Sequence, residues 1–397
     1  MPEVARRRSA RSSLLQPTAV NSILAEVRAL QAQGRQLASL MRGEPDFRTP
    51  EHIAEAAIRS LRDGRTAYPD NRGEPELREA VAAKLHRENQ LRYDAGTEIL
   101  VTTGATFGIY AALSALLNEG DEVLLPDPIY DAYQSPIRLA GARPRAVAAT
   151  LGSARFRLDV ASLEDAWTPS CRMLLLNTPW NPVGTVFRKD ELLEIAGFLE
   201  RRKLLLLSDE IYEAITYDGH LHVSPAALSA SLRERCVLVN SLSKTYAMTG
   251  WRVGYCAGPP DLIAAMFLVL QQSSRGPATF IQDAAAAALC GPQDCVAGMR
   301  AEYARRRARV IEELRGISGV QVMAPEGGFF AMVDARALLV PSDEIRRRLL
   351  HDAGVVVVHG AAYGAGGEGT LRVSFGSGGD KLAEGLRRLR EGLLRIR

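Results

Sequence analysis

The stretch C-V-L-V-N-S-L-S-K-T-Y-A-M-T-G-W-R-V-G-Y, from Cys236 to Tyr255, begins as an apolar run and continues into small hydroxyl residues and a lysine. The run Cys236–Ser241 predicts a strand that is apolar on both faces, which is typical of a parallel sheet covered by helices on both sides. Helical patterns at Ile109–Leu117 and Lys189–Arg202 separate further runs of this kind. The sequence therefore predicts an α/β fold with a mostly parallel central sheet. The other predicted strands of this sheet are Ile99–Thr102, Glu122–Leu125, Met173–Asn177 and Lys203–Ser208.

The pattern changes after about residue 285, where arginine-rich helices flank short strands, as in a smaller α+β domain. We therefore predict an N-terminal arm with a small-domain segment (1–45), a large domain (46–285) and a small C-terminal domain (286–397). The helices predicted in the last part are Ala301–Leu314 and Asp343–Asp352, and the strands are Val320–Val322, Phe329–Val333, Val355–Val358 and Leu371–Phe375.

Composition excludes several classes of protein. A net charge of +3 points to neither a nucleic-acid nor a membrane partner, and the apolar run Ile263–Leu270 is far shorter than a membrane span. The five cysteines lack C-x-x-C spacing, so we expect reduced thiols in a cytoplasmic protein and no metal site. The basic stretch Met1–Ser13 has no apolar region after it, so we interpret it as a disordered tail.

Lysine is rare in this chain. Only five of its 49 basic residues are lysines, and the rest are arginines. Lys244 stands among small hydroxyl residues directly after a predicted strand, so it is a candidate for chemistry that only a primary amine can perform.

Chemically distinctive residues follow each predicted strand of the large domain. In an open parallel sheet, ligands bind at the carboxyl ends of the strands, so these segments are expected to converge on one edge. The segments are G-A-T-F-G after Thr103, P-D-P-I-Y after Leu125, N-T-P-W-N-P-V-G after Leu176, S-D-E-I-Y after Leu207 and N-S-L-S-K after Val239.

Two groups of residues in these segments suggest a cofactor. Gly104, Ala105 and Thr106 open a predicted helix, whose free N–H groups suit a phosphate, and Ser241, Ser243 and Arg252 are further phosphate donors. Asp209 suits a protonated heteroaromatic nitrogen, Tyr212 and Asn181 suit an aromatic oxygen, and Tyr130 suits a ring face. Arg372, on a predicted strand, suits a substrate carboxylate.

Each of these residues also has a structural interpretation: a plain turn, a helix-capping aspartate, a packed tyrosine or a solvated arginine. Together, however, they match pyridoxal 5′-phosphate (PLP), which binds a lysine and pairs its ring nitrogen with an acid.

The sequence resembles the class I/II aminotransferases, which are fold-type I PLP enzymes, in the subgroup with a G-E-P-D-F segment. The resemblance runs from about residue 35 to the C-terminus. It rests on M-R-G-E-P-D-F-R-T-P (Met41–Pro50), T-A-Y-P-D-N-R-G-E-P-E-L-R-E-A, T-T-G-A-T, N-P-V-G, S-D-E-I-Y, S-L-S-K-T-Y-A-M-T-G-W-R-V-G-Y and L-R-V-S-F.

The resemblance implies an aminotransferase that moves the α-amino group of an L-amino acid to a 2-oxo acid. It implies Lys244 as the lysine that forms the internal aldimine, Asp209 as partner of the pyridine nitrogen, and Asn181 and Tyr212 at the phenolic oxygen. Tyr130 would stack on the ring, and Arg372 with Asn181 and the backbone of Gly43 would bind the substrate carboxylate. The phosphate would be bound by Gly104, Ala105, Thr106, Ser241, Ser243, Arg252 and, from the neighbouring subunit of a homodimer, Tyr68.

Some positions depart from the family pattern. Thr106 stands where some members that act on dicarboxylates carry a lysine. Trp180 is expected to place a bulky ring beside the cleft. Together with Tyr130, Phe107 and Thr106, it favours an aromatic or aliphatic substrate. Arg275 lies in a segment that borders the partner's site in relatives, so we hypothesise that it binds an acidic side chain; the alternative is an ordinary surface arginine.

Other reactions of the same fold remain open at this point: a C–S lyase, an elimination or cyclisation enzyme, or a racemase. A PLP-binding regulator and a non-catalytic PLP-binding protein are the alternatives from other classes.

Overall fold

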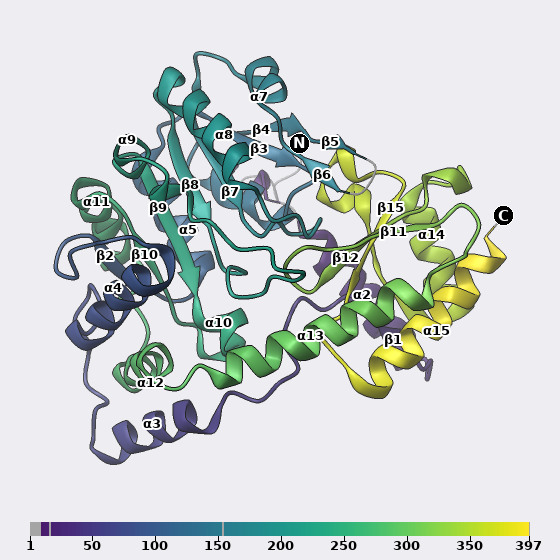
Figure 1. Cartoon of the computed structure of the whole chain (residues 1–397), viewed down its shortest axis with the longest axis horizontal. Coiled ribbons are helices and arrows are strands. Elements are labelled where there is room, and N and C mark those ends of the chain that lie inside the picture. Colours follow the sequence, from purple (N-terminus) through teal and green to yellow (C-terminus); the bar gives the residue numbers. More distant parts are fainter. Residues whose placement is uncertain (1–8, 16, 153–154, 397) are drawn as a thin grey trace.

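The computed structural model describes residues 9–15, 17–152 and 155–396, and within them the larger sheet has seven strands (Figure 1). In this described part only β10 runs antiparallel to its neighbours, and the other strands are parallel. The predicted mostly parallel sheet is therefore confirmed. In spatial order the strands are β2 (Ile99–Thr102), β10 (Gly254–Ala257), β9 (Cys236–Ser241), β8 (Leu205–Asp209), β7 (Cys171–Asn177), β3 (Glu122–Asp127) and β4 (Arg143–Ala148).

Helices cover both faces of this sheet because successive strand residues point to opposite sides. In β9, Leu238 packs into one apolar cluster, whereas Val237 and Val239 pack into another on the opposite face. The first cluster includes residues of α3 (Glu51–Arg62), α4 (Pro75–Asn89), α8 (Lys189–Arg202) and α12 (Thr279–Cys290). The second includes residues of α5 (Ala105–Leu116), α6 (Gln134–Leu139) and α11 (Pro260–Gln271).

Several predicted boundaries were correct, and others were wrong for local reasons. The bounds of β2, β9 and α8 agree with the prediction. Strand β8 begins at Leu205 because Lys203 adopts a left-handed conformation (φ 54°) that ends α8. The predicted strand Val355–Val358 is divided: β13 (Val355–Val356) pairs with β1 (Ala38–Ser39), and β14 (Val358–His359) pairs with β15 (Thr370–Ser374).

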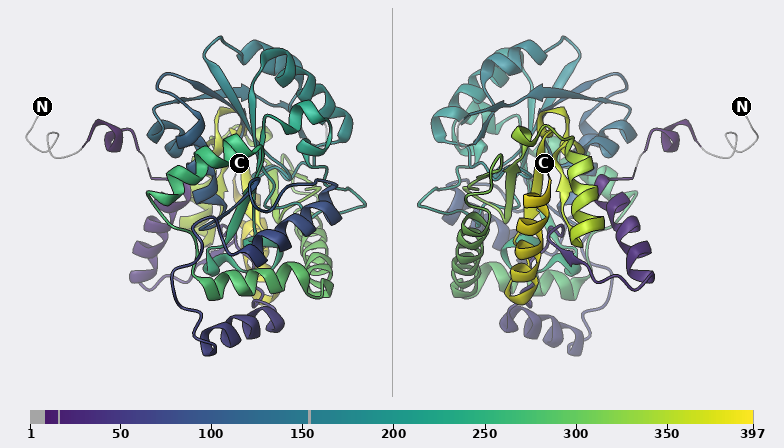
Figure 2. Two further views of the ribbon diagram at one scale, coloured as in Figure 1. Left: turned by 90° about the vertical axis from the view of Figure 1, so that its left-hand side faces the viewer. Right: turned by 90° about the vertical axis from the view of Figure 1, so that its right-hand side faces the viewer.

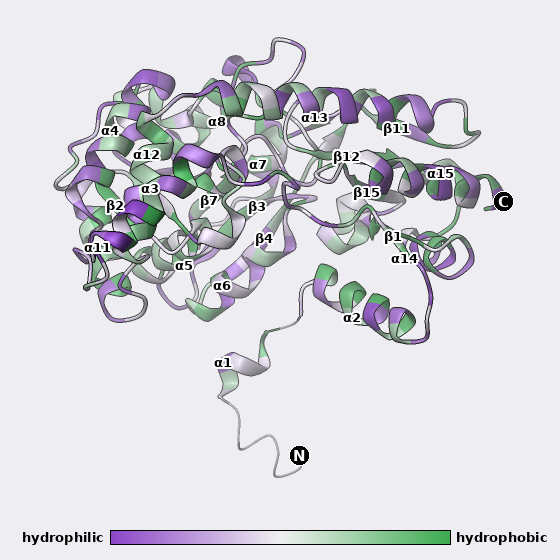
Figure 3. Cartoon of the chain, turned by 90° about the horizontal axis from the view of Figure 1, so that it is seen from below, coloured by the Kyte–Doolittle hydropathy of each residue, from purple (hydrophilic) through white to green (hydrophobic). Residues whose placement is uncertain are grey.

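A smaller antiparallel sheet and its helices form the other end of the molecule, coloured light green to yellow in Figures 1 and 2. Helices α13 (Asp294–Glu313) and α15 (Gly379–Arg395) carry both hydrophilic and hydrophobic residues along their length, as expected for helices with one buried face (Figure 3). Besides β14, the sheet contains β11 (Gln321–Met323), β12 (Phe330–Asp334) and β15 (Thr370–Ser374), and the helices are α13 (Asp294–Glu313), α14 (Ser342–Arg348), a π-helical turn (Leu349–Ala353) and α15 (Gly379–Arg395).

The segment before residue 45 packs against this smaller sheet. Helix α2 (Ala19–Ala32) buries Ile23 and Val27 in a cluster with Val358 of β14. The boundaries at 45/46 and 285/286 remain our prediction. Of the predicted tail, residues 1–8 lie outside the described residues, whereas Ala10–Ser13 form the helical turn α1, so the prediction of disorder is wrong for these four residues.

The remaining elements are short. Within the described ranges, no helix combines the length and the apolar character that a membrane span requires. The short strands and α-helices are β5 (Thr150–Leu151), β6 (Phe156–Arg157), α7 (Val160–Ala166), α9 (Ala230–Arg233) and α10 (Leu242–Thr245). The 3₁₀ turns are η2 (Asp131–Tyr133), η3 (Pro225–Ala227), η4 (Thr249–Trp251), η5 (Arg336–Leu338), η7 (Gly360–Tyr363) and η8 (Ala365–Gly367).

Candidate active site

The carboxyl ends of β7, β8 and β9 meet at one edge of the large sheet. Asn177 ends β7 beside Asp209, the last residue of β8, and its Nδ2 donates to the Asp209 carbonyl oxygen at 3.0 Å. The Glu210 amide donates to the Val239 carbonyl oxygen at 2.9 Å, which ties β8 to β9. The segments that follow these strands are therefore held together.

Lys244 lies in the helical turn α10, directly after β9. Its Nζ donates to the carbonyl oxygen of Gly43 at 2.7 Å, although the two residues are 201 positions apart. Burial lowers the pKa of the Lys244 ammonium to about 8, and the positive charges of Arg252 and Arg372 act in the same direction. A useful fraction of this side chain is thus an uncharged amine near neutral pH.

The predicted phosphate residues surround the start of α5. A Cβ atom on Gly104 would lie 2.7 Å from Arg252 Nη2, so the guanidinium packs directly against this glycine, whose φ of +76° also favours glycine. Ala105 and Thr106 begin the helix behind it. Ser241 and Ser243 are buried and linked, since the Ser241 hydroxyl donates to Ser243 Oγ at 2.7 Å.

Asp209 is buried at the end of β8, and burial raises its pKa to about 6. The phenol of Tyr133 donates to Asp209 Oδ2 at 2.6 Å, and the Ile211 amide donates to Oδ1 at 3.3 Å. Both bonds favour the ionised carboxylate and oppose the effect of burial. Tyr133 was not predicted as a site residue, although it follows the same strand end as Tyr130, and that position indicated it.

Replacing Tyr133 by phenylalanine is expected to move the acidic limb of the kcat/KM pH profile upward by about one pH unit. A hydrogen bond to a charged group contributes about 1.5–3 kcal/mol, and one pKa unit corresponds to about 1.36 kcal/mol. Losing the bond raises the pKa of Asp209. The carboxylate of the variant is therefore protonated at a higher pH than that of the wild type, and activity is lost at that higher pH. Tyr93→Phe is the matched control, because the buried Tyr93 hydroxyl has no hydrogen-bond partner in the described part of the chain. An unchanged acidic limb in Tyr133→Phe would contradict the role of this bond.

Aromatic rings line the space beside Asp209. Tyr212 is buried edge-on against Phe329 and Phe330, with ring centroids 5.6 and 5.9 Å apart. Tyr130 packs edge-on against Tyr133 at 5.4 Å. Burial raises the pKa of both Tyr212 and Tyr130, so their phenols stay protonated at neutral pH.

Arg372 of β15 is 3% exposed, which settles the burial that its strand pattern left open. Its Nη1 donates to Asn181 Oδ1 at 3.2 Å, and its Nη2 donates to the Met41 carbonyl oxygen at 3.0 Å. The rings of Phe330 and Tyr363 lie 4.2 and 4.9 Å from its guanidinium carbon. Its buried Nε has no partner within the described residues. Arg372 thus lies beside Asn181 and beside the backbone of Met41, two residues before Gly43.

Tyr68 and Arg275 lie on the surface. Tyr68 is 87% exposed, and the Arg275 guanidinium carbon lies 5.5 Å from its ring centroid. The two predicted contributors from a neighbouring subunit therefore share one exposed patch.

Trp180 does not line the cleft, so that expectation is wrong. Its side chain is 1% exposed and stacks on Phe187 at 5.6 Å within the core of the large domain. Its Nε1 donates to the Pro128 carbonyl oxygen at 2.9 Å, which fixes the ring in this direction. Trp180 therefore does not favour an aromatic substrate.

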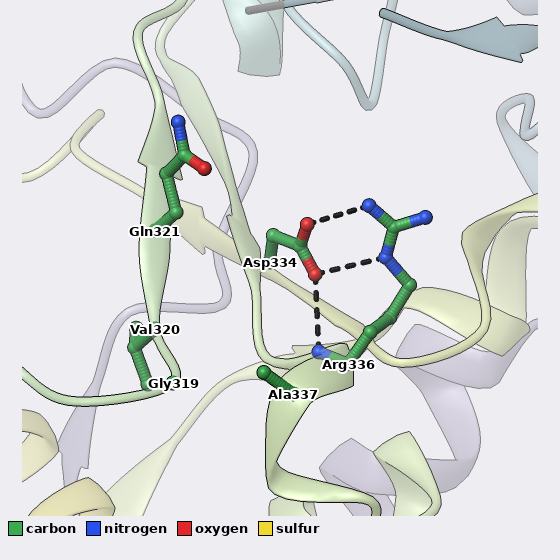
Figure 4. A pocket seen from close by; sticks show the side chains of 6 residues that line it. All are labelled: Gly319, Val320, Gln321, Asp334, Arg336 and Ala337. Carbon is green, nitrogen blue, oxygen red and sulfur yellow. Dashed lines mark hydrogen bonds and ion pairs between the residues drawn. The ribbon is translucent and has the colours of Figure 1, made fainter. Parts of the chain in front are cut away.

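A hollow on the small domain is a poorer candidate for a site (Figure 4). Its charged lining residues, Asp334 and Arg336, neutralise each other through two side-chain bonds of 2.6 and 2.9 Å. It has no amine or buried acid in its lining. The remaining lining residues are Gly319, Val320, Gln321 and Ala337.

The residues at the sheet edge fit PLP. Lys244 offers a half-buried amine of lowered pKa, and Asp209 offers a buried acid. The cradle between Gly104 and Arg252 is closed to any larger residue at position 104 and has the charge that a phosphate requires.

Known proteins resemble this chain over nearly its whole length. Residues 35–389 match the family described as aminotransferase class I and II. Aromatic-amino-acid aminotransferase 2 of Thermococcus litoralis is 41% identical over 361 residues, covering 90% of this chain and 92% of that protein. Aspartate aminotransferase of Pyrococcus abyssi is 39% identical over 383 residues, covering 96% and 97%. The crystal structure of the aspartate aminotransferase from Rhizobium meliloti superposes with a TM-score of 0.94 at 36% identity, covering 98% of this chain and 99% of that one.

Proposed function

This chain belongs to the class I and II aminotransferases, and on that basis we propose which of its residues carry the reaction and which substrates they select. It is a PLP-dependent enzyme that transfers the amino group of an amino acid to a 2-oxo acid. The observation that carries our assignment is the meeting of a half-buried amine, Lys244, and a buried acid, Asp209, at one sheet edge.

The cofactor supplies an aldehyde that reacts with amines and a pyridine ring that accepts electrons from the substrate α-carbon. Lys244 would bind the aldehyde carbon, and Asp209 would hold a proton on the ring nitrogen. Asn181 and Tyr212 would donate to the phenolic oxygen, and Tyr130 would cover the ring face. The phosphate would be bound by Gly104, Ala105, Thr106, Ser241, Ser243 and Arg252.

Lys244 would also move the substrate proton. Its Nζ takes the proton from the substrate α-carbon, and this requires the uncharged amine. Arg372 holds the substrate carboxylate through its planar fork, with Asn181 and the backbone at Gly43 beside it. Fixing the carboxylate orients the α-hydrogen toward the amine.

The rate at which the apoenzyme captures added PLP is expected to rise about tenfold between pH 7 and pH 9. An ammonium group with a pKa of about 8 loses its proton across that interval, whereas an unperturbed lysine, with a pKa of about 10.4, does so two units higher. Stopped-flow absorbance would measure the rate. A small-molecule primary amine gives the unperturbed profile, and an enzyme profile that matched it would contradict the assignment.

A homodimer would complete the site. Tyr68 is almost fully exposed, and we propose that it reaches the phosphate in the partner subunit. Arg275, beside Tyr68, would then lie near the partner's substrate.

Relatives are named for aspartate and for aromatic amino acids, so both classes are candidate amino donors. We expect Arg275→Ala to lower kcat/KM for acidic donors about tenfold relative to neutral ones, because a charge-assisted hydrogen bond is lost. A donor screen with 2-oxoglutarate and pyruvate as acceptors measures this, with the exposed Arg315→Ala as control. An unchanged ranking of donors would show that Arg275 is an ordinary surface residue.

Elimination and cyclisation are the second candidate reactions, but nothing in the described residues favours them. Adding an amino acid without a 2-oxo acid acceptor distinguishes amino transfer from these reactions. Formation of pyridoxamine phosphate with release of the 2-oxo acid is the result expected for amino transfer. Release of ammonia with repeated turnover would contradict it.

A further inference from the structure

A buried lysine, Lys84, belongs to a hydrogen-bonded group that reaches the candidate site. All five lysines fall in the described part of the chain, and only Lys84 and Lys244 among them are not exposed. Lys84, in α4, is 4% exposed. Its Nζ donates to Glu213 Oε1 and, at 2.8 Å, to Asn89 Oδ1. Burying a charged side chain costs free energy because the charge loses its hydration. The presence of a lysine at this position therefore needs an explanation.

Glu213 is the acceptor at the centre of this group. It follows Tyr212 in the turn after β8, and its carboxylate accepts from Asn89 Nδ2 at 2.7 Å and from Asn240 Nδ2 at 2.6 Å, besides Lys84. Burial raises the pKa of Glu213, but the charges of Lys84 and His222 and the hydrogen bonds from Asn89 and Lys84 lower it below its ordinary value. The carboxylate is therefore ionised and paired.

The group continues into the segment that carries Lys244. Asn240 uses its Nδ2 on Glu213 and its Oδ1 to accept from the Ser241 amide at 2.7 Å. Ser241 caps the turn α10, since the Ser243 amide donates to its Oγ at 3.0 Å. One carboxylate is thus connected to the segment of Asp209 and Tyr212 through the backbone and to the segment of Ser241 and Lys244 through Asn240.

A metal ion is the competing explanation for this region. Ligand atoms of Glu210, Glu213 and His222 lie within 4.8 Å of one another. However, Glu213 already has the Lys84 ammonium beside it, and Glu210 accepts from Ser208, Ser224 and His222 at 2.8–2.9 Å. The chain itself supplies the cation that the carboxylates require.

We propose that Lys84 and Glu213 are a positioning pair that holds the two cofactor-binding segments in register. Glu213 fixes the end of β8 against the end of β9, and Lys84 supplies the positive charge that pairs with its carboxylate. The proposal rests on the proposed function, because it concerns the site that binds PLP.

The pair also explains why position 84 carries a lysine in a chain in which most basic residues are arginines. The ammonium is a compact charge with three rotatable donors, and here it meets Asn89 and Glu213 inside the protein. Glu88 lies 3.5 Å from it. A planar guanidinium needs more room and a fixed fork of acceptors.

The test compares Lys84→Met and Glu213→Gln with wild type. We expect the dissociation constant for PLP to rise about tenfold or more in each, because a hydrogen bond to a charged group is lost and Ser241 is released. The pH midpoint of the visible band of the bound cofactor should shift as well. If a single variant does not fold, the double variant Lys84→Met/Glu213→Gln, which buries no unpaired charge, provides the same comparison.

Arg346→Met is the matched control, since Arg346 is also a buried cation, paired with Glu26 at 2.8 Å in the small domain. It should lower the melting temperature and leave the PLP dissociation constant within about twofold of wild type. If the Lys84 and Glu213 variants behaved like this control, the pair would only support the fold and the proposal would be wrong. Failure of the wild-type protein to bind PLP would instead overturn the proposed function.

Discussion

Replacing Lys244 by arginine is expected to reduce the rate of amino transfer by at least ~10⁴-fold. A positioned general base contributes about 10²–10⁴-fold, and here the same residue also binds the cofactor. Arginine stays protonated in proteins, so it can neither attack the aldehyde carbon nor accept the α-proton. The lowered pKa of Lys244, caused mainly by burial, shows that its surroundings favour the form that arginine cannot adopt.

A single-turnover reaction with excess amino acid measures the effect directly. Reduction with borohydride followed by mass spectrometry reports whether the cofactor is attached at residue 244. Lys381→Arg is the control, because Lys381 is exposed on α15. Substantial amino transfer by Lys244→Arg would refute the assignment on which the proposed function depends.

The sequence predicted those parts of the fold that depend on neighbouring residues. Strands β2 and β9 were located correctly because each is a continuous apolar run buried on both faces. Strand β10 was missed because its residues, Gly254 to Ala257, are mostly small. Its place between β2 and β9 is decided by tertiary contacts, since a Cβ atom on Gly254 would lie 2.7 Å from the Asn240 carbonyl oxygen.

Prediction of the site from the sequence is limited in the same way, because contacts between distant residues cannot be read from it. The positions of the candidate residues follow from the rule that parallel strand ends converge, so a single sequence could indicate them. Their partners could not be read in this way, because Tyr133 and Asp209 are 76 positions apart and Lys84 and Glu213 are 129 apart. The direction of Trp180 was wrong for a related reason, since it depends on a hydrogen bond to Pro128.

Replacing Asp209 by asparagine is expected to lower kcat about 10³-fold. A buried carboxylate opposite a ring nitrogen stabilises the positive charge on that nitrogen, and removing one such preorganised group costs about 10²–10³-fold or more. With its pKa raised by burial to about 6, Asp209 is ionised above that pH and so carries the required negative charge at pH 7.5. Asparagine has the same size but no charge, and it does not hold a proton on the nitrogen.

N-methylated PLP separates this electrostatic role from a structural one, because its ring nitrogen is permanently positive. We expect it to restore a large part of the single-turnover rate in Asp209→Asn and to leave Lys244→Arg inactive, since the missing group in that variant is the amine. Asp334→Asn, which removes an acid from the small domain, controls for a general loss of stability. If N-methylated PLP gave no recovery in a folded Asp209→Asn protein, the carboxylate would act by holding Tyr133 and the backbone of Ile211 in place rather than by its charge.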